Sequence, residues 1–395
     1  MVGVVIDATA KPDTLAAPMS RTIPDSTVVN ERTRKLIHVI TDLYVGGAET
    51  MLTRVATAKP GVADDTMVIS LVRDGFYAGR LRAAGIPVVE LNFRNPFAAV
   101  LGLFQIAKVI REYQPDIIQS WMYHADLAAA FALAISGRRK RTHLVWGIRC
   151  SDLDLARYGI VLRLVIRLCA VFSRLPDLVI ANSHAGMNWH RSIGFHPRAS
   201  EIVYNGIEEE LYKPDAAARS TLRAELGIPT DALLLIHVAR RDPMKDHESF
   251  LRAMQELPHL RAIMVGAGTD SLPCPPGTVG LGQRADVPRL LAAADILVCS
   301  SAFGEGFSNS IAEGMAAGLP VVATDVGDNS LVVGEAGTIV PPRDHRALAA
   351  GIRALASLSA EERARLGTSA RARAVAQFTL KQSLASFAAA YTRLA

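Results

Sequence analysis

The sequence predicts an α/β protein with two domains, each built on a parallel sheet covered by helices on both faces. Three observations support this prediction. The chain has 395 residues, more than a single hydrophobic core comfortably holds. Half of the residues are apolar but only 6% are aromatic, a composition typical of buried aliphatic strands. Short apolar runs alternate with helical segments, and this alternation stops once and then restarts.

The first alternating stretch follows residues 1–34, an aperiodic, Pro-containing segment that we expect to be a mobile tail. Apolar runs bounded by turn residues then predict strands at 36–40, 67–72, 88–91, 115–121, 142–148 and 178–182. One helix is expected to begin at Val45–Glu49, a second to end near Ala84, and a third to span about 98–113. Because strands separated by helices pair in parallel, these elements predict one doubly covered sheet.

Residues 203–214 interrupt the alternation and indicate a linker, so we expect a first domain at 35–204 and a second at 205–371. Strands of the second domain are predicted at 233–238, 261–265, 278–281, 296–299 and 321–324. Helices are predicted at 246–256 and 286–293, and a last helix near 372–393 makes 372–395 a separate C-terminal element. Ligands of such sheets bind at the carboxyl ends of the strands, which predicts a site in a cleft between the domains.

The loop that follows the strand at 296–299 carries two carboxylates in an apolar frame. Glu305 stands in the loop and Glu313 lies inside the short helix that follows. An N-cap at Ser308 or Asn309 is expected. With this N-cap, the backbone N–H groups of Gly306, Phe307 and Ser308 are unpaired and point into the loop. A helix start of this kind attracts phosphate, so the spacing suits a diphosphate with a ribose at Glu313 and a sugar at Glu305.

The Glu-x7-Glu arrangement is followed by Gly-Met-Ala-Ala-Gly-Leu-Pro-Val-Val-Ala-Thr-Asp at 314–325. Together they resemble the donor-site signature of retaining glycosyltransferases of family 4, the group 1 glycosyl transferases of bacterial polysaccharide assembly. Tyr-Asn-Gly-Ile-Glu at 204–208 resembles the family's transition into its second domain. The resemblance implies the GT-B fold, in which two Rossmann-like, doubly wound domains face a central cleft. It also implies that the first domain binds the acceptor, the second binds the nucleotide sugar, and the C-terminal helix returns to the first domain.

The same resemblance implies a hexosyltransferase type of reaction that needs no metal and no cofactor. The donor substrate would be a nucleotide diphosphate sugar, and the product would retain the anomeric configuration. The acceptor would be a glycan or a lipid-linked sugar of cell-surface polysaccharide or glycolipid biosynthesis. The base, the sugar, the acceptor, the linkage and the oligomeric state stay open. A GT-B-fold sugar-nucleotide epimerase and a non-catalytic nucleotide-sugar-binding protein are the alternative functions.

Arg240 and Lys245 follow the strand at 233–238 with the Arg-x4-Lys spacing of the family's basic pair. The resemblance implies that they clamp the donor diphosphate and act in catalysis together with Glu305, since their charge neutralises the leaving nucleoside diphosphate. Arg241 could take the place of Arg240. A solvated loop with surface charges is the alternative interpretation.

Other candidate residues lie in the first domain, at or near strand ends. Gly46 and Gly47 resemble the family's glycine loop, where the missing Cβ lets the backbone approach a phosphate or sugar; a plain tight turn is the alternative. His124 matches the catalytic histidine that the family places beside the reacting carbon, although a structural histidine fits too. Trp121 and Arg149 are candidates for acceptor binding, the arginine through an acceptor phosphate.

Two further loops carry residues of interest. Leu281 to Arg284 follow a predicted strand of the second domain and are expected to frame the base through backbone groups. Asp152 and Asp154 form an Asp-x-Asp pair, the metal signature of the other glycosyltransferase architecture, the GT-A fold. This pair is remote in sequence from the donor motif, so we interpret it as incidental and expect no metal site.

Composition and charge restrict the compartment and the partners. No apolar run reaches the ~18–20 residues that cross a bilayer, the first residues lack the basic start of a signal peptide, and four cysteines without metal spacing suggest a reduced, cytoplasmic protein. Residues 31–200 hold 22 Lys and Arg against 13 Asp and Glu, which predicts an anionic partner. No nucleic-acid-binding motif is present and aromatic residues are few, so we expect no nucleic acid.

A membrane surface is the anionic partner that the sequence favours. Residues 155–175 are apolar, carry four arginines and contain no acidic residue. On a helix Arg163, Arg167 and Arg174 share one face, as in helices that lie at a membrane surface. A core helix with one solvated basic face is the alternative. The hypothesis is a cytoplasmic enzyme bound peripherally to the inner face of an anionic membrane.

Overall fold

The computed structural model describes residues 34–58, 62 and 65–394. By packing, the chain divides into residues 1–32 and 33–395, and the second unit contains everything described here. The predicted N-terminal tail therefore lies outside the described residues, apart from its last position.

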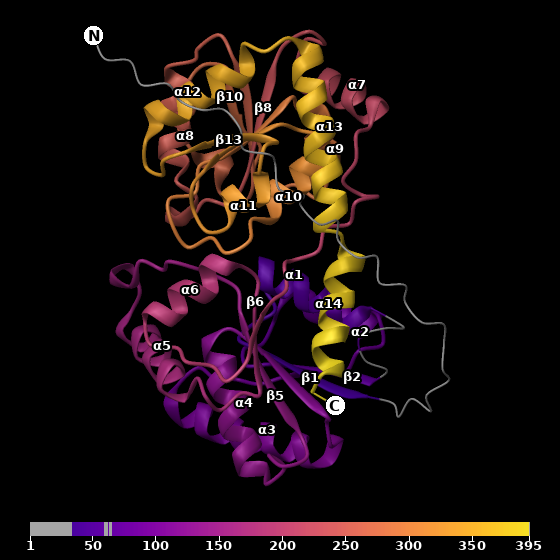
Figure 1. Cartoon of the computed structure of the whole chain (residues 1–395), viewed down its shortest axis with the longest axis vertical. Coiled ribbons are helices and arrows are strands. Elements are labelled where there is room, and N and C mark those ends of the chain that lie inside the picture. The colour runs from indigo at the N-terminus through magenta and orange to yellow at the C-terminus, as the bar shows by residue number, and fades with distance from the viewer. Residues whose placement is uncertain (1–33, 59–61, 63–64, 395) are drawn as a thin grey trace, which may run out of the picture. The chain divides into compact units, whose positions relative to one another are not determined.

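The N-terminal sheet, which includes the strands labelled β1, β2, β5 and β6 in Figure 1, contains seven parallel strands in the order β3-β2-β1-β4-β5-β6-β7. Their bounds are β1 Lys35–Ile40, β2 Asp65–Ser70, β3 Val88–Glu90, β4 Ile117–Trp121, β5 His143–Ile148, β6 Leu178–Ala181 and β7 Ser200–Ile202. The chain turns from one half of the sheet to the other between β1 and β4, where Leu36 pairs with Ile117. This order confirms the predicted doubly wound parallel sheet.

Two layers of helices cover this sheet. One layer holds α3 Pro96–Tyr113, α4 Tyr123–Ser136, α5 Ile160–Phe172 and α6 His184–Ser192, whose inner residues share a core with the sheet. The other holds α1 Gly47–Thr57, α2 Phe76–Ala83 and the C-terminal α14 Leu380–Thr392. Phe387 and Tyr391 anchor α14 there, and the Tyr391 hydroxyl donates to Gln119 Oε1 on β4 at 3.3 Å.

The C-terminal sheet has six parallel strands in the order β10-β9-β8-β11-β12-β13. Their bounds are β8 Leu234–Val238, β9 Arg261–Val265, β10 Thr278–Gly280, β11 Ile296–Cys299, β12 Val321–Thr324 and β13 Gly337–Val340. One face packs on α7 Ala216–Glu225, α9 Val287–Ala293, α10 Asn309–Ala316, α11 Asn329–Val333 and α13 Ala360–Gln377. The other packs on α8 His247–Gln255 and α12 His345–Ala356. The two sheets agree with the GT-B expectation.

The structure corrects several element boundaries. The predicted helix at 372–393 is two helices, because the chain breaks at Phe378 and Thr379 and α14 starts with a capping box between Thr379 and Gln382. β2 begins and ends two residues earlier than predicted. The short strand β7 was not predicted, since its three half-buried residues carry no alternating pattern. Among the described helices, none is long and apolar enough to span a membrane.

Candidate active site

The candidate site forms where loops at the carboxyl ends of the two sheets touch. The loop after β11 contains Glu305, and the loop after β8 contains Lys245 in the short 3₁₀ helix Pro243–Lys245. The Lys245 ammonium donates to Glu305 Oε1, which also accepts from the Ser301 hydroxyl at 2.8 Å. Burial opposes the charged form of Lys245, but the Glu305 carboxylate outweighs it and raises the pKa of Lys245. The predicted cation and carboxylate therefore form one buried ion pair.

The loop around Glu305 lies directly against the first domain. The Ser151 hydroxyl, from the loop after β5, donates to the Glu305 carbonyl, and the Ser151 N–H donates to the Gly304 carbonyl at 3.4 Å. A Cβ on Gly306 would come closer than 3.0 Å to the Asn182 amide of the loop after β6. Only glycine permits this approach, so the backbone at Gly306 is held beside the first domain.

The start of α10 agrees with the prediction at the level of the backbone. Ser308 is the N-cap, and its hydroxyl caps no backbone N–H. Phe307 turns its ring into the core against Tyr204 and Phe378, so only its backbone faces the loop. The side-chain Oδ1 of Asn309 accepts from the Asn205 side-chain amide at 2.9 Å. The unpaired N–H groups of this helix start can hold an anion.

Glu313 lies one turn further along α10, half-buried in a polar cluster. Its carboxylate hydrogen-bonds to the Tyr212 hydroxyl and lies near Arg54 of α1. Arg54 itself donates to Glu208 at 3.0 Å and to the Gly206 carbonyl at 2.8 Å. Burial raises the pKa of Glu313 to about 7, although Arg54 and Tyr212 favour the charged form.

The structure distinguishes the two adjacent arginines that the sequence left open. Arg240 is exposed, pairs with Asp242 at 3.0 Å, and lies near enough to influence the pKa of both Lys245 and Glu49. The Arg241 side chain packs on Gly268 and donates to the Ser271 hydroxyl at 3.4 Å. Arg240 therefore faces the candidate site, and Arg241 is held by another loop.

The glycine loop of the first domain also reaches this point. Gly46 is the N-cap of α1, and a Cβ on Gly47 would lie 3.4 Å from the Asn309 amide. The Glu49 carboxylate folds back over Gly46, and burial raises the pKa of Glu49 to about 7. Sequence reasoning assigned no role to Glu49, although it belongs to the Gly-Gly motif.

His124 occupies the first turn of α4, just after β4. Its side chain is half-buried, and no hydrogen bond links it to another described residue. Burial lowers its pKa, so the neutral imidazole is favoured. A neutral ring with unused nitrogen atoms can donate or accept one hydrogen bond to a ligand.

The structure buries Trp121, for which an acceptor role was predicted. Its side chain is 0% exposed, and the indole N–H donates to His38 Nδ1 at 3.1 Å beneath the sheet edge. Arg149 is also buried, with its guanidinium 4.4 Å from the centre of the Trp121 ring and 3.3 Å from the Asn205 carbonyl oxygen. Both side chains point into the protein because α14 covers them through Phe387. The acceptor role of Trp121 and Arg149 stays a prediction.

The remaining predicted residues lie in ordered loops. Leu281 packs on the core and its N–H donates to the Met264 carbonyl at 2.8 Å. The Arg284 guanidinium forms a bidentate ion pair with the Asp286 carboxylate, with both N–O distances at 2.7 Å. Asp154 pairs with Arg157 at 2.9 Å. Across residues 34–58, 62 and 65–394, no group of three or more His, Cys, Asp or Glu is arranged to hold a metal ion.

One interdomain contact was not predicted. The Asp328 carboxylate, from the loop after β12, accepts from the backbone N–H groups of His184 at 2.7 Å and Ala185 at 2.8 Å. It thus occupies the N-terminus of α6, where the helix dipole favours negative charge. No local sequence pattern reveals this pairing, because its partners lie more than 140 residues apart.

Comparisons with known proteins agree with this architecture. Residues 45–211 match the family described as Glycosyltransferase Family 4, and residues 232–357 match Glycosyl transferases group 1. The D-inositol 3-phosphate glycosyltransferase of Mycobacterium tuberculosis is 31% identical over 218 residues, 51% of this chain and 45% of that protein. The chain thus matches just under half the length of this curated relative.

Solved structures extend the likeness to nearly the whole chain. Anabaena HepE in complex with UDP-glucose superposes with a TM-score of 0.79 and 25% identity, covering 91% of this chain and 99% of that one. A glycosyltransferase of Rickettsia africae shares the fold, with a TM-score of 0.75, 17% identity and coverage of 91% and 98%. With its two parallel sheets and its two family matches, the chain belongs to the group 1 glycosyltransferases of family 4 and has the GT-B fold.

Proposed function

We propose that this protein transfers a sugar from a nucleoside diphosphate sugar to a glycan or lipid-linked acceptor, without a metal and with retention of configuration. The observation that supports the proposal is the pairing of Lys245 with Glu305, in the loop that leads into the open N-terminus of α10. Arg240 lies near enough to influence the pKa of Lys245, and Glu313 lies one turn further along α10. Cations and N–H groups suit a diphosphate, while carboxylates suit sugar and ribose hydroxyls.

In this proposal the protein positions the substrates and stabilises the leaving group. Donor departure and acceptor attack take place on one face of the sugar, and a donor phosphate oxygen takes the acceptor proton. Lys245 and Arg240 hold the diphosphate, Glu313 holds the ribose, and Glu305 and His124 hold the sugar. Because Lys245 already pairs with Glu305, an arriving diphosphate meets a cation that is held in place.

The first test concerns the base. HepE is described in complex with UDP-glucose, so UDP sugars are the first choice for a thermal-shift screen that also includes GDP and ADP sugars. A ligand at 100 times its Kd should stabilise the protein by about 2.7 kcal/mol. An epimerase would convert the donor with no acceptor present, and a non-catalytic binding protein would release no nucleoside diphosphate with any acceptor.

Glu313→Gln should weaken donor binding at least tenfold. The substitution keeps the shape but removes the charge from two hydrogen bonds to the ribose, each worth roughly 1.5–3 kcal/mol. Since the pKa of Glu313 is raised to about 7, the dissociation constant of the wild type should rise as the pH falls from 8 to 6. Titration calorimetry across this range measures both effects.

The matched control for this titration is Glu49→Gln, because the pKa of Glu49 is also raised to about 7. It should keep the pH dependence of donor binding, whereas Glu313→Gln should abolish it. Unchanged donor affinity in Glu313→Gln would show that Glu313 does not bind the donor.

Lys245→Ala should abolish transfer, while EDTA should leave the wild-type rate unchanged. The reason is that Lys245 and Arg240 would supply the charge that a metal supplies elsewhere. Arg241→Ala removes an adjacent cation that is held by another loop, and it should keep most of the activity. The metal-independent reaction would be refuted if transfer strictly required Mg²⁺ or Mn²⁺ and this metal-dependent activity were lost in Asp152→Asn.

His124→Ala should lower kcat far more than it weakens donor binding, because its contact is expected at the bond being made. Steady-state kinetics beside a direct measurement of donor affinity separates the two effects. Equal losses in both, or none, would make His124 a structural residue.

We further propose that the protein works in the cytoplasm at the inner face of an anionic membrane, which α5 contacts. Only Ile166 and Cys169 of α5 are buried, whereas Ile160 and Val161 are 78% and 65% exposed beside the exposed Arg163. This exposure favours an interfacial helix over the core helix that the sequence left open. Each cation near an anionic leaflet contributes about 1 kcal/mol to the free energy of membrane binding.

Co-sedimentation with vesicles tests the membrane proposal. Binding should require anionic lipid, weaken at high salt because exposed charges are screened, and fall in the double variant Val161→Ser, Leu164→Ser. Equal binding to neutral vesicles, or no binding, would contradict it.

A further inference from the structure

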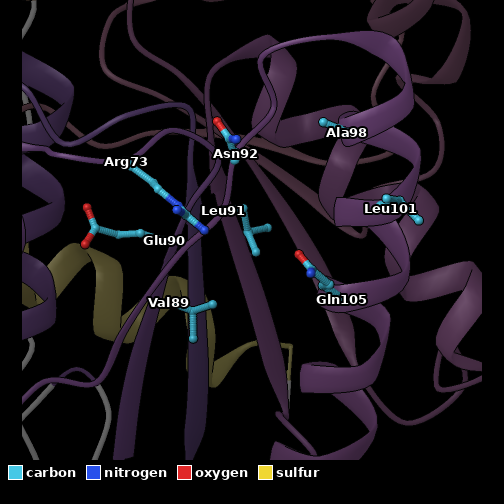
Figure 2. A pocket seen from close by; sticks show the side chains of 8 residues that line it. All are labelled: Arg73, Val89, Glu90, Leu91, Asn92, Ala98, Leu101 and Gln105. Atoms are coloured by element: carbon cyan, nitrogen blue, oxygen red, sulfur yellow. The ribbon is translucent and has the colours of Figure 1, made fainter.

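A cavity of about 390 Å³ lies at the edge of the N-terminal sheet, away from the candidate active site. It opens between the carboxyl end of the edge strand β3 and the first turns of α3 (Figure 2). The cavity is open to solvent: Arg73, from the loop after β2, and Gln105, which faces it from α3, are both exposed. Asn92 supplies a second amide, and Leu91 and Leu101 supply an apolar wall.

The charges of this cavity do not cancel. Its one carboxylate, Glu90, is neutralised by Arg82 at 2.6 Å and also accepts from the Asp74 N–H at 3.0 Å. The Arg73 guanidinium, in contrast, makes no ion pair or hydrogen bond to another described residue; only its backbone carbonyl is used, by the Tyr44 hydroxyl at 3.3 Å. One unpaired cation with two amide groups beside it suits a small anionic group.

The cavity continues into an exposed apolar stripe on α3. Phe97, Val100, Leu101 and Phe104 are 74%, 52%, 49% and 55% exposed, and their spacing places them on one face of the helix. Leu101 belongs to both features, since it lines the cavity and lies in the stripe.

The stripe is rigidly placed. The Asn95 side chain caps α3 by accepting from the Ala98 N–H at 2.8 Å. The ring of Phe93 lies against Gly102, where any Cβ would come closer than 3.0 Å. The inner face of the helix, with Ile106 and Ile110, is fully packed in the core. The outward-facing apolar residues are therefore not needed for the core of this domain.

We propose that this cavity binds the phosphate headgroup of one lipid phosphate, whose hydrocarbon chain lies along the α3 stripe. The assignment rests on the proposed function, because the lipid phosphate would be the anchor of a lipid-linked acceptor. A free phosphate or a soluble glycan would leave the stripe unused, and a single unpaired arginine in a cavity of this size suits one headgroup.

The position agrees with such an acceptor. The sheet order places β3 three strand spacings, roughly 14 Å, from β4, whose following loop carries His124. The carboxyl ends of β3 and β4 lie at the same edge of one parallel sheet. A phosphate with a short saccharide can span this separation, so the proposed acceptor is a lipid-linked glycan with few sugars.

The experiment titrates the full chain with farnesyl phosphate, farnesol and inorganic phosphate by calorimetry. Farnesyl phosphate should bind at least tenfold more tightly than either of the other two. Arg73→Gln and Phe104→Ser should each weaken it at least tenfold. Lys108→Gln is the matched control, because it removes the same charge from α3 at a residue that lines no part of the cavity, and it should stay within twofold of the wild type.

Several results would overturn the assignment. Equal affinity in Arg73→Gln, or an equal loss in Lys108→Gln, would show that the cavity does not recognise the phosphate. If farnesol bound as tightly as farnesyl phosphate, the phosphate would not be part of the recognised ligand. If inorganic phosphate bound as tightly, the hydrocarbon chain would not be part of it. Loss of binding to anionic vesicles in Arg73→Gln, with farnesyl phosphate binding intact, would assign the surface to bulk membrane instead.

Donor binding separates this inference from the proposed function. UDP-glucose affinity should be unchanged in Arg73→Gln and Phe104→Ser, since neither residue belongs to the donor site. Farnesyl phosphate binding that responds to Arg73→Gln, in a protein that binds no nucleotide sugar, would support the cavity and refute the donor proposal.

Discussion

The backbone of the loop that carries Glu305 is packed without room for side chains, and the candidate site depends on this constraint. A Cβ on Gly304, Gly306 or Gly327 would come closer than 3.0 Å to neighbouring atoms. Gly304 and Gly327 also have positive φ, which residues with a Cβ rarely adopt. Glycine at these positions lets the loop pack closely, with the Glu305 carboxylate beside Lys245 and the Glu305 carbonyl beside Ser151.

Charge is distributed around this loop in a way that suits an anionic ligand. Lys245 is neutralised internally by Glu305, and Arg240 is only partly engaged by Asp242 at the surface. Asp328 uses its charge at the start of α6, so this carboxylate holds the two domains together instead of facing a phosphate. The open helix start at Ser308 and the two cations are therefore the groups that would hold the diphosphate in the proposed reaction.

The first domain has a different surface. Its helices α3 and α5 flank α4 and share one core with it, yet both carry exposed apolar residues such as Phe97 and Ile160. Helices that served only as a cover for the sheet would be polar on this side. The proposed amphiphilic partner would account for both the apolar exposure and the arginines of α5, and it would connect the membrane proposal with the cavity at Arg73.

The sequence by itself determined most of the strands, several of the helices and the motif that contains Glu305 and Glu313. Apolar runs, glycine turns and caps are local signals, so β11, α10 and the segment around Glu305 and Glu313 follow from them. Only the tertiary structure decided the rest. Trp121 is buried because α14 returns over it from far along the chain, and Arg240 rather than Arg241 faces the site because the loop at Gly268 holds the latter. Contacts between distant segments, including Asp328 at α6, leave no local pattern, and for that reason only the folded structure shows them.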